Sequence, residues 1–337
     1  MKQIKADEIL KKIEEGMNVY YENVEIDGDL DFTKVKDTAK ETNERYRSYI
    51  NSSIAFNHCV FTGKIIAYKS LTEDKTKTHY GTSFQRNLSI TESKIEGEFI
   101  FRDVIFTGLA DFTNTLFYNH SYFYNAKFKS GCEFSQAIFY DYTNFFIADF
   151  IGNSDFRYSK FHNEADFGRA LFSGYTNFSE ANFLGNKADF YNVQFSGYAN
   201  FFSTQFSGYA NFFSTQFSGY ANFRKVKFNS NVYFGEVQFS STSDFRYVQF
   251  LNSTHFMGAQ FSGYANFREV LTSGELDFSE AQFYCKADFR NGLFKGKVNY
   301  QGVFFIIKAN FDNVSFEQKP NFKNTNYLGK PFEFNDK

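Results

Sequence analysis

The chain of 337 residues contains no tryptophan, two prolines, three methionines and three cysteines. Because Cys59, Cys132 and Cys285 are odd in number and scattered, they exclude a disulfide framework and are typical of a reduced, cytoplasmic protein. No stretch approaches the roughly 20 apolar residues of a membrane-spanning helix. The charged N-terminus also lacks the apolar segment of a signal peptide. We therefore predict a cytoplasmic protein with no membrane association.

A strong charge of either sign is also lacking. The sequence has 36 basic and 38 acidic residues, a net charge of −2 and a pI near 6.3. Nucleic-acid-binding domains usually carry a clear basic excess, so this balance makes nucleic acid an unlikely partner. The five histidines are scattered and form neither an HExxH motif nor a Cys/His cluster. Because no nucleophile or phosphate-binding motif stands in its usual context either, we predict no enzyme, no metal and no cofactor.

Aromatic residues are abundant instead, with 50 phenylalanines and 23 tyrosines. Residues 196–228 read SGYANFFSTQF, SGYANFFSTQF and SGYANFRKVKF, which is one block of eleven residues repeated three times. Its phenylalanines recur in alternating steps of five and six, and a small or β-branched residue stands two places before each of them. The predicted core of this block is Phe201, Phe206, Phe212, Phe217, Phe223, Phe228, Ala199, Ala210 and Ala221.

Small, polar, large and polar residues alternate within each unit, which is the period of a half-buried strand. An α-helix is disfavoured for two reasons. Steps of five and six place successive phenylalanines on opposite helix faces, and Gly, Asn and Ser are poor helix formers. A stack of short strands, a β-solenoid, is therefore favoured. Arginine follows the large residue every 22 positions, at Arg224, Arg246, Arg268 and Arg290. Side chains on successive coils stack, so 22 residues should make one coil of four sides.

The recurring units Ala110-Asp111-Phe112, Ala199-Asn200-Phe201 and Ala287-Asp288-Phe289 resemble the Phe-centred motif of the pentapeptide repeat family. The resemblance implies a right-handed quadrilateral parallel β-helix over about residues 84–327. The chain departs from the family's strict unit by one extra corner residue in alternate units. Some members of this family resemble B-form DNA in size and charge and act on topoisomerases.

The repeat divides the chain into successive parts. The amphipathic pattern of residues 6–15 predicts a short helix that covers the first coil. Residues 34–47 carry no core phenylalanine and could form a short helix or a loop. The C-terminal Pro331, Phe332 and Phe334 are expected to cover the last coil, since a bare edge would pair with a second copy end to end. The predicted parts are a capping helix at 1–17, interrupted coils at 18–68 with an insertion at about 34–49, a loop insertion at 69–83, regular coils at 84–328 and a C-terminal cap or tail at 329–337.

The arginine column is the candidate interaction face. Allowing for one extra residue near 185–187, Arg157 belongs to the same column as the four later arginines. The alternative is local pairing, because Asp155, Asp244 and Asp288 stand two residues before their arginines. Asn222 and Asn266 take that place beside Arg224 and Arg268. We favour pairing for the column as a whole.

Outward phenylalanines are a second surface feature. Phe146, Phe202 and Phe213 directly follow a core phenylalanine, so their side chains should point away from the core. Exposed large apolar side chains can mark a binding patch. We favour stacking with corner tyrosines, because the three lie on separate sides and coils.

Three functions follow as hypotheses. The first is a non-enzymatic protein-interaction scaffold of unknown partner, either a monomer or an end-to-end homodimer. The second, implied by the family resemblance, is a DNA mimic that binds or inhibits a gyrase-type topoisomerase, which would need a continuous acidic face. The third, direct nucleic-acid binding through the arginine column, is opposed by the net charge of −2.

Overall fold

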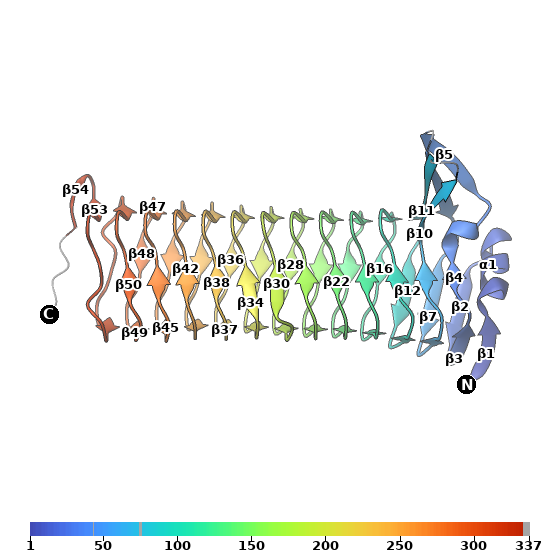
Figure 1. Cartoon of the computed structure of the whole chain (residues 1–337), viewed down its shortest axis with the longest axis horizontal. Coiled ribbons are helices and arrows are strands. Elements are labelled where there is room, and N and C mark those ends of the chain that lie inside the picture. Colours follow the sequence, from blue (N-terminus) through green and yellow to red (C-terminus); the bar gives the residue numbers. More distant parts are fainter. Residues whose placement is uncertain (43, 74–75, 333–337) are drawn as a thin grey trace. The chain divides into compact units, whose positions relative to one another are not determined.

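A computed structural model describes residues 1–42, 44–73 and 76–332. It confirms an all-β parallel solenoid of about 15 turns, roughly 22 residues apart, with one short helix near the N-terminus. Successive strands of each coil belong to four different sheets, called A to D here, so each coil has four sides. The chain forms two compact units, Met1–Phe172 (unit 1) and Ser173–Lys337 (unit 2), and each is described by itself (Figure 1).

Unit 1 begins with a strand and a helix that cover its first coil. The strand β1 (Lys2–Lys5) pairs in parallel with β3 (Val24–Asp27) and extends sheet A. The helix α1 (Ala6–Glu14) follows at once, and its buried face is Ala6, Ile9, Leu10 and Ile13. It packs against β2 (Val19–Glu22) and β4 (Leu30–Asp31). Gly16 stands just past its end with φ of +74°, a conformation that glycine adopts without strain.

Some strands of the first coils have four residues, whereas most of the later strands have two. The elements of the first coils are η1 (Phe32–Lys34), β7 (Ile54–Asn57), β8 (Val60–Phe61), β9 (Ile65–Ile66), β12 (Leu88–Thr91) and β13 (Lys94–Ile95). Each of these strands pairs in parallel with its counterpart in the next coil, as in Ile54↔Leu88 and Val60↔Lys94.

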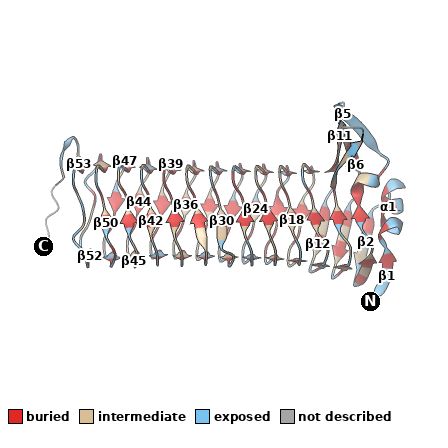
Figure 2. Cartoon of the chain, in the orientation of Figure 1, coloured by how far each residue is buried: buried red, intermediate tan, exposed pale blue. Residues whose placement is uncertain are grey.

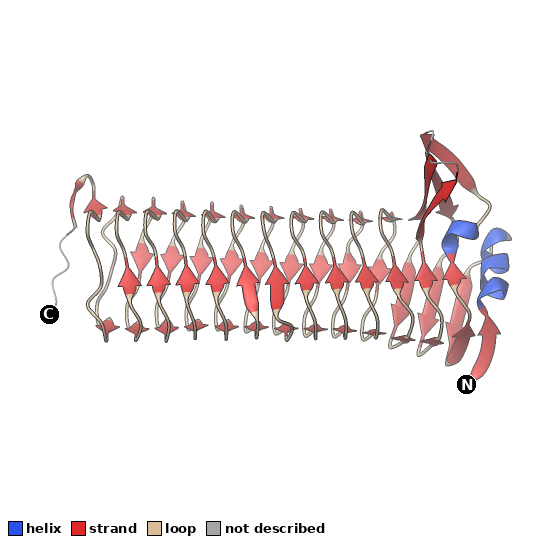
Figure 3. Cartoon of the chain, viewed as in Figure 1, coloured by secondary structure: helices blue, strands red, loops and turns tan. Residues whose placement is uncertain are grey.

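The two segments that interrupt the repeat are strand pairs. The strand β5 (Thr38–Thr42) runs antiparallel to β6 (Arg45–Ile50), and β10 (Tyr68–Glu73) runs antiparallel to β11 (Thr76–Phe84). Because β6 and β11 also pair in parallel, the four form one sheet in the order β5, β6, β11, β10. This sheet, the hairpin arm, rises away from the coils of unit 1 (Figures 1 and 3). It replaces the helix or loop that we expected at 34–47 and the loop expected at 69–83.

From β14 (Phe99–Ile100) to β53 (Asn326–Tyr327) the strands are pairs of residues, except for β30 (Lys187–Asp189) and β34 (Tyr209–Asn211). One full coil of unit 2 runs through β36 (Ala221–Asn222), β37 (Lys227–Phe228), β38 (Val232–Tyr233) and β39 (Gln238–Phe239). The next coil begins at β40 (Ser243–Asp244), which pairs with β36 in the register Ala221↔Ser243. This step of 22 residues is the one that the arginine column predicts.

The coil interior is filled by phenylalanine. The nine core residues predicted for 196–228 are at most 1% exposed, and the buried strands are red in Figure 2. The ring of Phe223 stacks on Phe201 and Phe245, with centroids 5.0 and 4.9 Å away. It also meets Phe212 and Phe234 edge to face at 5.6 and 5.4 Å. Burial of each ring stabilises the fold by about 2–3 kcal/mol before chain entropy is counted.

The last coil of unit 2 is partly covered. The strand β54 (Lys330–Pro331) folds back antiparallel on β53 in sheet D. The Phe332 ring then lies 5.2–5.9 Å from the rings of Phe305, Phe311 and Phe322. Phe334 and the remainder of the predicted C-terminal cap, 333–337, lie outside the described residues.

Glycine at the six-residue corners allows the coils to stack closely. At Gly219 a Cβ atom would lie 2.3 Å from the carbonyl oxygen of Gly197 in the preceding coil. The obstacle is backbone, which cannot swing away as a side chain can. The strand spacing of ~4.8 Å therefore favours a residue without a side chain here.

We predict that Gly219→Ala lowers the free energy of unfolding by roughly 1–3 kcal/mol, because the two coils must move apart to admit the methyl group. Chemical denaturation followed by circular dichroism measures the change. Ser218→Ala, at the exposed neighbouring corner position, is the matched control and should stay within about 0.5 kcal/mol of the parent. Equal stability of the two variants would contradict the close approach.

Candidate interaction surfaces

A ladder of Asn and Asp side chains runs along the outer side of sheet B in unit 2. It passes through β32 (Ala199–Asn200), β36, β40, β44 (Ala265–Asn266) and β48 (Ala287–Asp288). Each Oδ1 accepts a hydrogen bond from the backbone N–H two residues later, as Asn222 does from Arg224 at 3.1 Å. This local bond directs the chain around the corner. It also places the residue after each core phenylalanine on the outer surface, and the arginines occupy this position.

Two of the arginines close over a buried carboxylate. Arg246 donates to Asp244 from Nε and Nη2, at 2.9 and 2.6 Å, while the Tyr220 hydroxyl donates to Oδ2 at 3.0 Å. Two coils later, Arg290 and Tyr264 donate hydrogen bonds to Asp288 in the same way. The carboxylate side chains are only 3% and 0% exposed, whereas both arginine side chains are 35% exposed. The acidic groups are therefore saturated and hidden beneath the basic ones.

These contacts shift the titration of the groups involved. Burial alone would raise the pKa of Asp244, but the hydrogen bonds from Arg246 and Tyr220 outweigh it and hold the pKa below its usual value. The pKa of Asp288 is lowered by the same balance of burial against Arg290 and Tyr264. Burial and the hydrogen bond to Asp288 raise the pKa of Tyr264 to about 12.

The other two arginines have a different environment. Arg224 and Arg268 stand beside the amides Asn222 and Asn266, and within the described residues neither forms an ion pair. The Nε atom of each is buried and has no hydrogen-bond partner in the described chain. The Arg224 guanidinium lies 5.9 Å from the Phe202 ring and 5.8 Å from the Tyr247 ring. Pairing thus holds for alternate arginines only.

Arg157 occupies the equivalent position in unit 1, and its Nε lies 2.6 Å from Asp155. Here the ladder is acidic, with Asp111, Glu133 and Asp155 on successive coils of sheet B. Burial and then the charges of Asp155 and Asp111 raise the pKa of Glu133. This acidic column was not predicted, although its spacing of 22 residues is visible in the sequence.

The outward phenylalanines pack against neighbouring coils. Phe146 stacks on Tyr124 with centroids 6.1 Å apart, and Phe213 stacks on Tyr191 at 6.3 Å. These tyrosines stand in the same column as the phenylalanines, one coil earlier, so the stacking partners are not the corner tyrosines that we expected. Phe202 lies beneath the cations Arg224 and Lys225 instead.

The hairpin arm is anchored by a buried cation that the sequence analysis did not single out. Arg47 pairs with Glu41 of β5 through Nε at 2.5 Å, and its Nη1 donates to the carbonyl oxygen of Asp103 at 2.9 Å. The rings of Tyr46 and Tyr80 stack across β6 and β11 at 5.5 Å. The arm is therefore bound firmly to the coils from which it rises.

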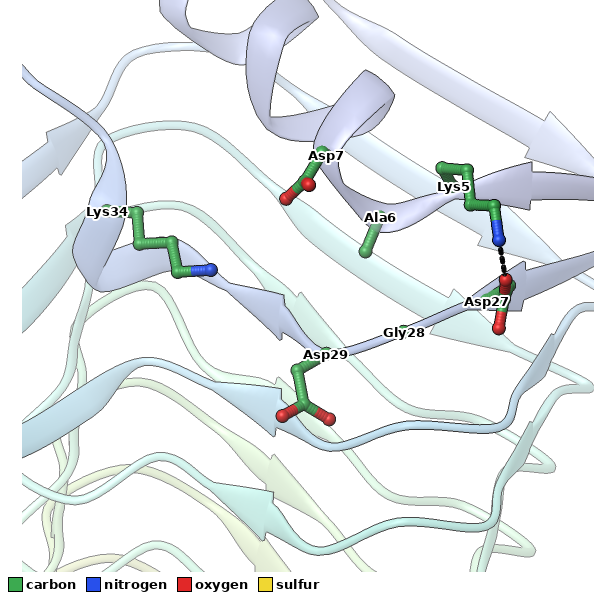
Figure 4. A pocket seen from close by; sticks show the side chains of 7 residues that line it. All are labelled: Lys5, Ala6, Asp7, Asp27, Gly28, Asp29 and Lys34. Carbon is green, nitrogen blue, oxygen red and sulfur yellow. Dashed lines mark hydrogen bonds and ion pairs between the residues drawn. The ribbon is translucent and has the colours of Figure 1, made fainter.

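A pocket of about 490 Å³ lies where α1 begins, between Lys5, Asp7, Asp27, Asp29 and Lys34 (Figure 4). Lys5 forms an ion pair with Asp27 across it. Its charges nearly balance, and none of the predicted site residues lines it. In the described part of the chain no three His, Cys, Asp or Glu side chains gather to hold a metal ion. No helix among the described residues is long and apolar enough to cross a membrane.

The comparison with protein families finds the model "Pentapeptide repeats (9 copies)" at residues 101–146, 156–205 and 223–271. The chain belongs to the pentapeptide repeat family. Solenoids of this family are generally non-catalytic. The comparison with curated proteins finds no match, and neither does the comparison with solved structures.

The buried carboxylates predict a pH dependence. A carboxyl group whose pKa is lower in the folded than in the unfolded chain stabilises the fold above its unfolded pKa of about 3.9, and this contribution is lost as the pH falls through the folded value. The double variant Asp244→Asn/Asp288→Asn should be less stable than the parent at pH 7, and the difference should shrink below about pH 4. Thermal unfolding between pH 7 and pH 2 measures it.

The substitution is structurally conservative, because Asn222 and Asn266 already occupy this position beside an arginine in the native chain. The double variant Glu275→Gln/Glu317→Gln, at two exposed positions of the same unit, controls for the change in net charge. A stability difference that stays constant across the pH range would show that the two carboxylates do not contribute in this way.

Proposed function

We propose that this pentapeptide repeat protein is a non-enzymatic scaffold that binds another protein through its hairpin arm. The observation that carries the proposal is the arm itself, where the chain leaves the coil twice to build a four-stranded sheet. The three free cysteines, two of them buried, support a reducing compartment such as the cytoplasm.

The arm offers two strand edges and an aromatic face. Strands β5 and β10 are its outer members, and each pairs on one side only among the described residues. Strand edges can accept a further strand from a partner. The exposed Lys40 on β5 is a charge of the kind that prevents indiscriminate pairing. These features favour a selective partner over aggregation.

The anchoring of the arm supports the same proposal. A surface that is held in one conformation loses less entropy on binding than a flexible loop does. Arg47, with its side chain only 6% exposed, ties β6 both to β5 through Glu41 and to the second coil along through the carbonyl oxygen of Asp103. Loss of this cation would leave Glu41 without its partner and release the arm.

Site-specific photocrosslinking in cells tests the proposal. A benzophenone amino acid at Lys40 or Thr72, both exposed on the arm, should yield a discrete adduct with one partner protein. The same label at Gln249, an exposed position of unit 2, is the matched control and should not yield it. Arg47→Met should lower the adduct yield at equal expression. The proposal fails if arm and control positions give the same adducts, or if the arm gives none.

The acidic column of unit 1 favours a second candidate, a DNA mimic that acts on a topoisomerase. Asp111, Glu133 and Asp155 stack like successive phosphates, although Arg157 neutralises the last of them. If the column binds the enzyme's DNA site, excess protein should inhibit supercoiling by purified gyrase. Asp111→Asn/Glu133→Gln should abolish inhibition, and Glu96→Gln/Glu269→Gln, with the same change in charge, should not. Supercoiling that is unaffected by excess parent protein would eliminate this candidate.

A further inference from the structure

The outer side of sheet B in unit 2 presents positive charge at alternate coils. We call Arg224, Arg246, Arg268 and Arg290 the arginine face. Two of these arginines, Arg246 and Arg290, neutralise almost fully buried carboxylates. Each carboxylate also accepts a hydrogen bond from a tyrosine hydroxyl. Arg224 and Arg268 have no such partner in the described chain. The positive charge available to another molecule is therefore concentrated on these two.

Charged residues near Arg224 and Arg268 do not cancel the positive charge of these two arginines. The corner residues next to the two arginines are Lys225 and Glu269, which balance each other. Lys286 adds a further cation on the opposite corner, near the Tyr264 ring. Asp312 follows Arg290 in the column and marks the end of the basic surface.

The spacing of the two free guanidinium groups restricts the ligand. They lie two coils apart, which is roughly 9.6 Å at a strand spacing of ~4.8 Å. A peptide in the polyproline II conformation places every third residue on one face, about 9.3 Å apart. An extended strand repeats at about 6.7 Å, and two turns of an α-helix span about 10.8 Å. Polyproline II matches the spacing most closely.

The aromatic surroundings favour the same ligand. Phe202 and Tyr247 flank the Arg224 guanidinium, and Tyr247 is 40% exposed. Aromatic side chains are the usual surface on which prolines of such peptides dock. The chain has only two prolines, Pro320 and Pro331, so a second copy cannot supply this ligand. The occupant must come from a different protein.

We propose that the arginine face binds an acidic, proline-rich segment of another protein in the polyproline II conformation. Carboxylates at every third residue pair with Arg224 and Arg268. A proline between them rests on Tyr247 in the intervening coil, and a proline before the first carboxylate rests on Phe202, one coil before Arg224. The inference deepens the proposed scaffold function, because it names the chemistry of one partner. It uses a different unit and a different surface from the hairpin arm.

The experiment measures binding of a fluorescent synthetic peptide that repeats Glu-Pro-Pro to the full chain, by fluorescence anisotropy at low salt. The parent should bind the peptide, and added salt should weaken the complex. Arg224→Gln/Arg268→Gln should weaken binding on the order of tenfold or more. Arg224→Lys/Arg268→Lys should retain part of the affinity because the charge remains. Circular dichroism verifies that each variant is folded.

Two controls separate this geometry from simple charge attraction. Lys295→Gln/Lys297→Gln removes two exposed cations elsewhere in unit 2 and should bind like the parent. A peptide that repeats Glu-Pro-Glu-Pro-Pro-Pro has the same composition with altered spacing and should bind more weakly. Equal binding of the two peptides, equal losses in the two double variants, or equally tight binding of a single-stranded oligonucleotide would overturn the inference. Crosslinking from the hairpin arm is independent of these outcomes, so failure of one proposal is distinguishable from failure of the other.

Discussion

The constraint on which the structure depends is the match between ring stacking and strand pairing. Hydrogen bonding between parallel strands fixes the distance between coils at ~4.8 Å. In the interior of unit 2, rings from successive coils stack at nearly that distance, as in Phe190–Phe212 and Phe212–Phe234, both at 4.8 Å. Each ring also meets rings of adjacent columns edge to face, so its position is fixed from several sides. Because one spacing satisfies both interactions, the core repeats with little variation.

The repetition of the core explains why the fold could be predicted from the sequence and where the prediction ended. Steps of five and six residues identify the phenylalanines, and the recurrence of arginine at 22 residues identifies the coil. The hairpin arm could not be predicted in this way, because Thr38–Thr42 and Tyr68–Glu73 carry no core residue. These two strands are stabilised by antiparallel pairing with β6 and β11, and β5 also by the ion pair of Glu41 with Arg47. No periodic pattern reveals these contacts.

The arginine face illustrates the same limit at the level of single residues. The alternation of Asn222, Asp244, Asn266 and Asp288 is visible in the sequence, and it indicates which arginines find a partner. The role of the Tyr220 and Tyr264 hydroxyls is not visible in the sequence, because each donates to a carboxylate 24 residues later, in the next coil. Only the three-dimensional arrangement shows that these carboxylates are saturated and buried. The contrast between paired and free arginines depends on that fact.

A regular core leaves the outer columns free to change. The hexapeptide SGYANF occurs at 218–223 and again at 262–267, two coils later, while the intervening coil has Asp244 in place of asparagine. From Asn222 to Asp288 the outer residue therefore alternates over two coils although the interior repeats over one, whereas the earlier Asn200 and Asn222 occupy successive coils. Since the rings tolerate either residue on the outside, stability does not require the longer period. A surface period longer than the structural one favours a ligand that spans two coils, because local pairing alone would be served equally well by aspartate in every coil.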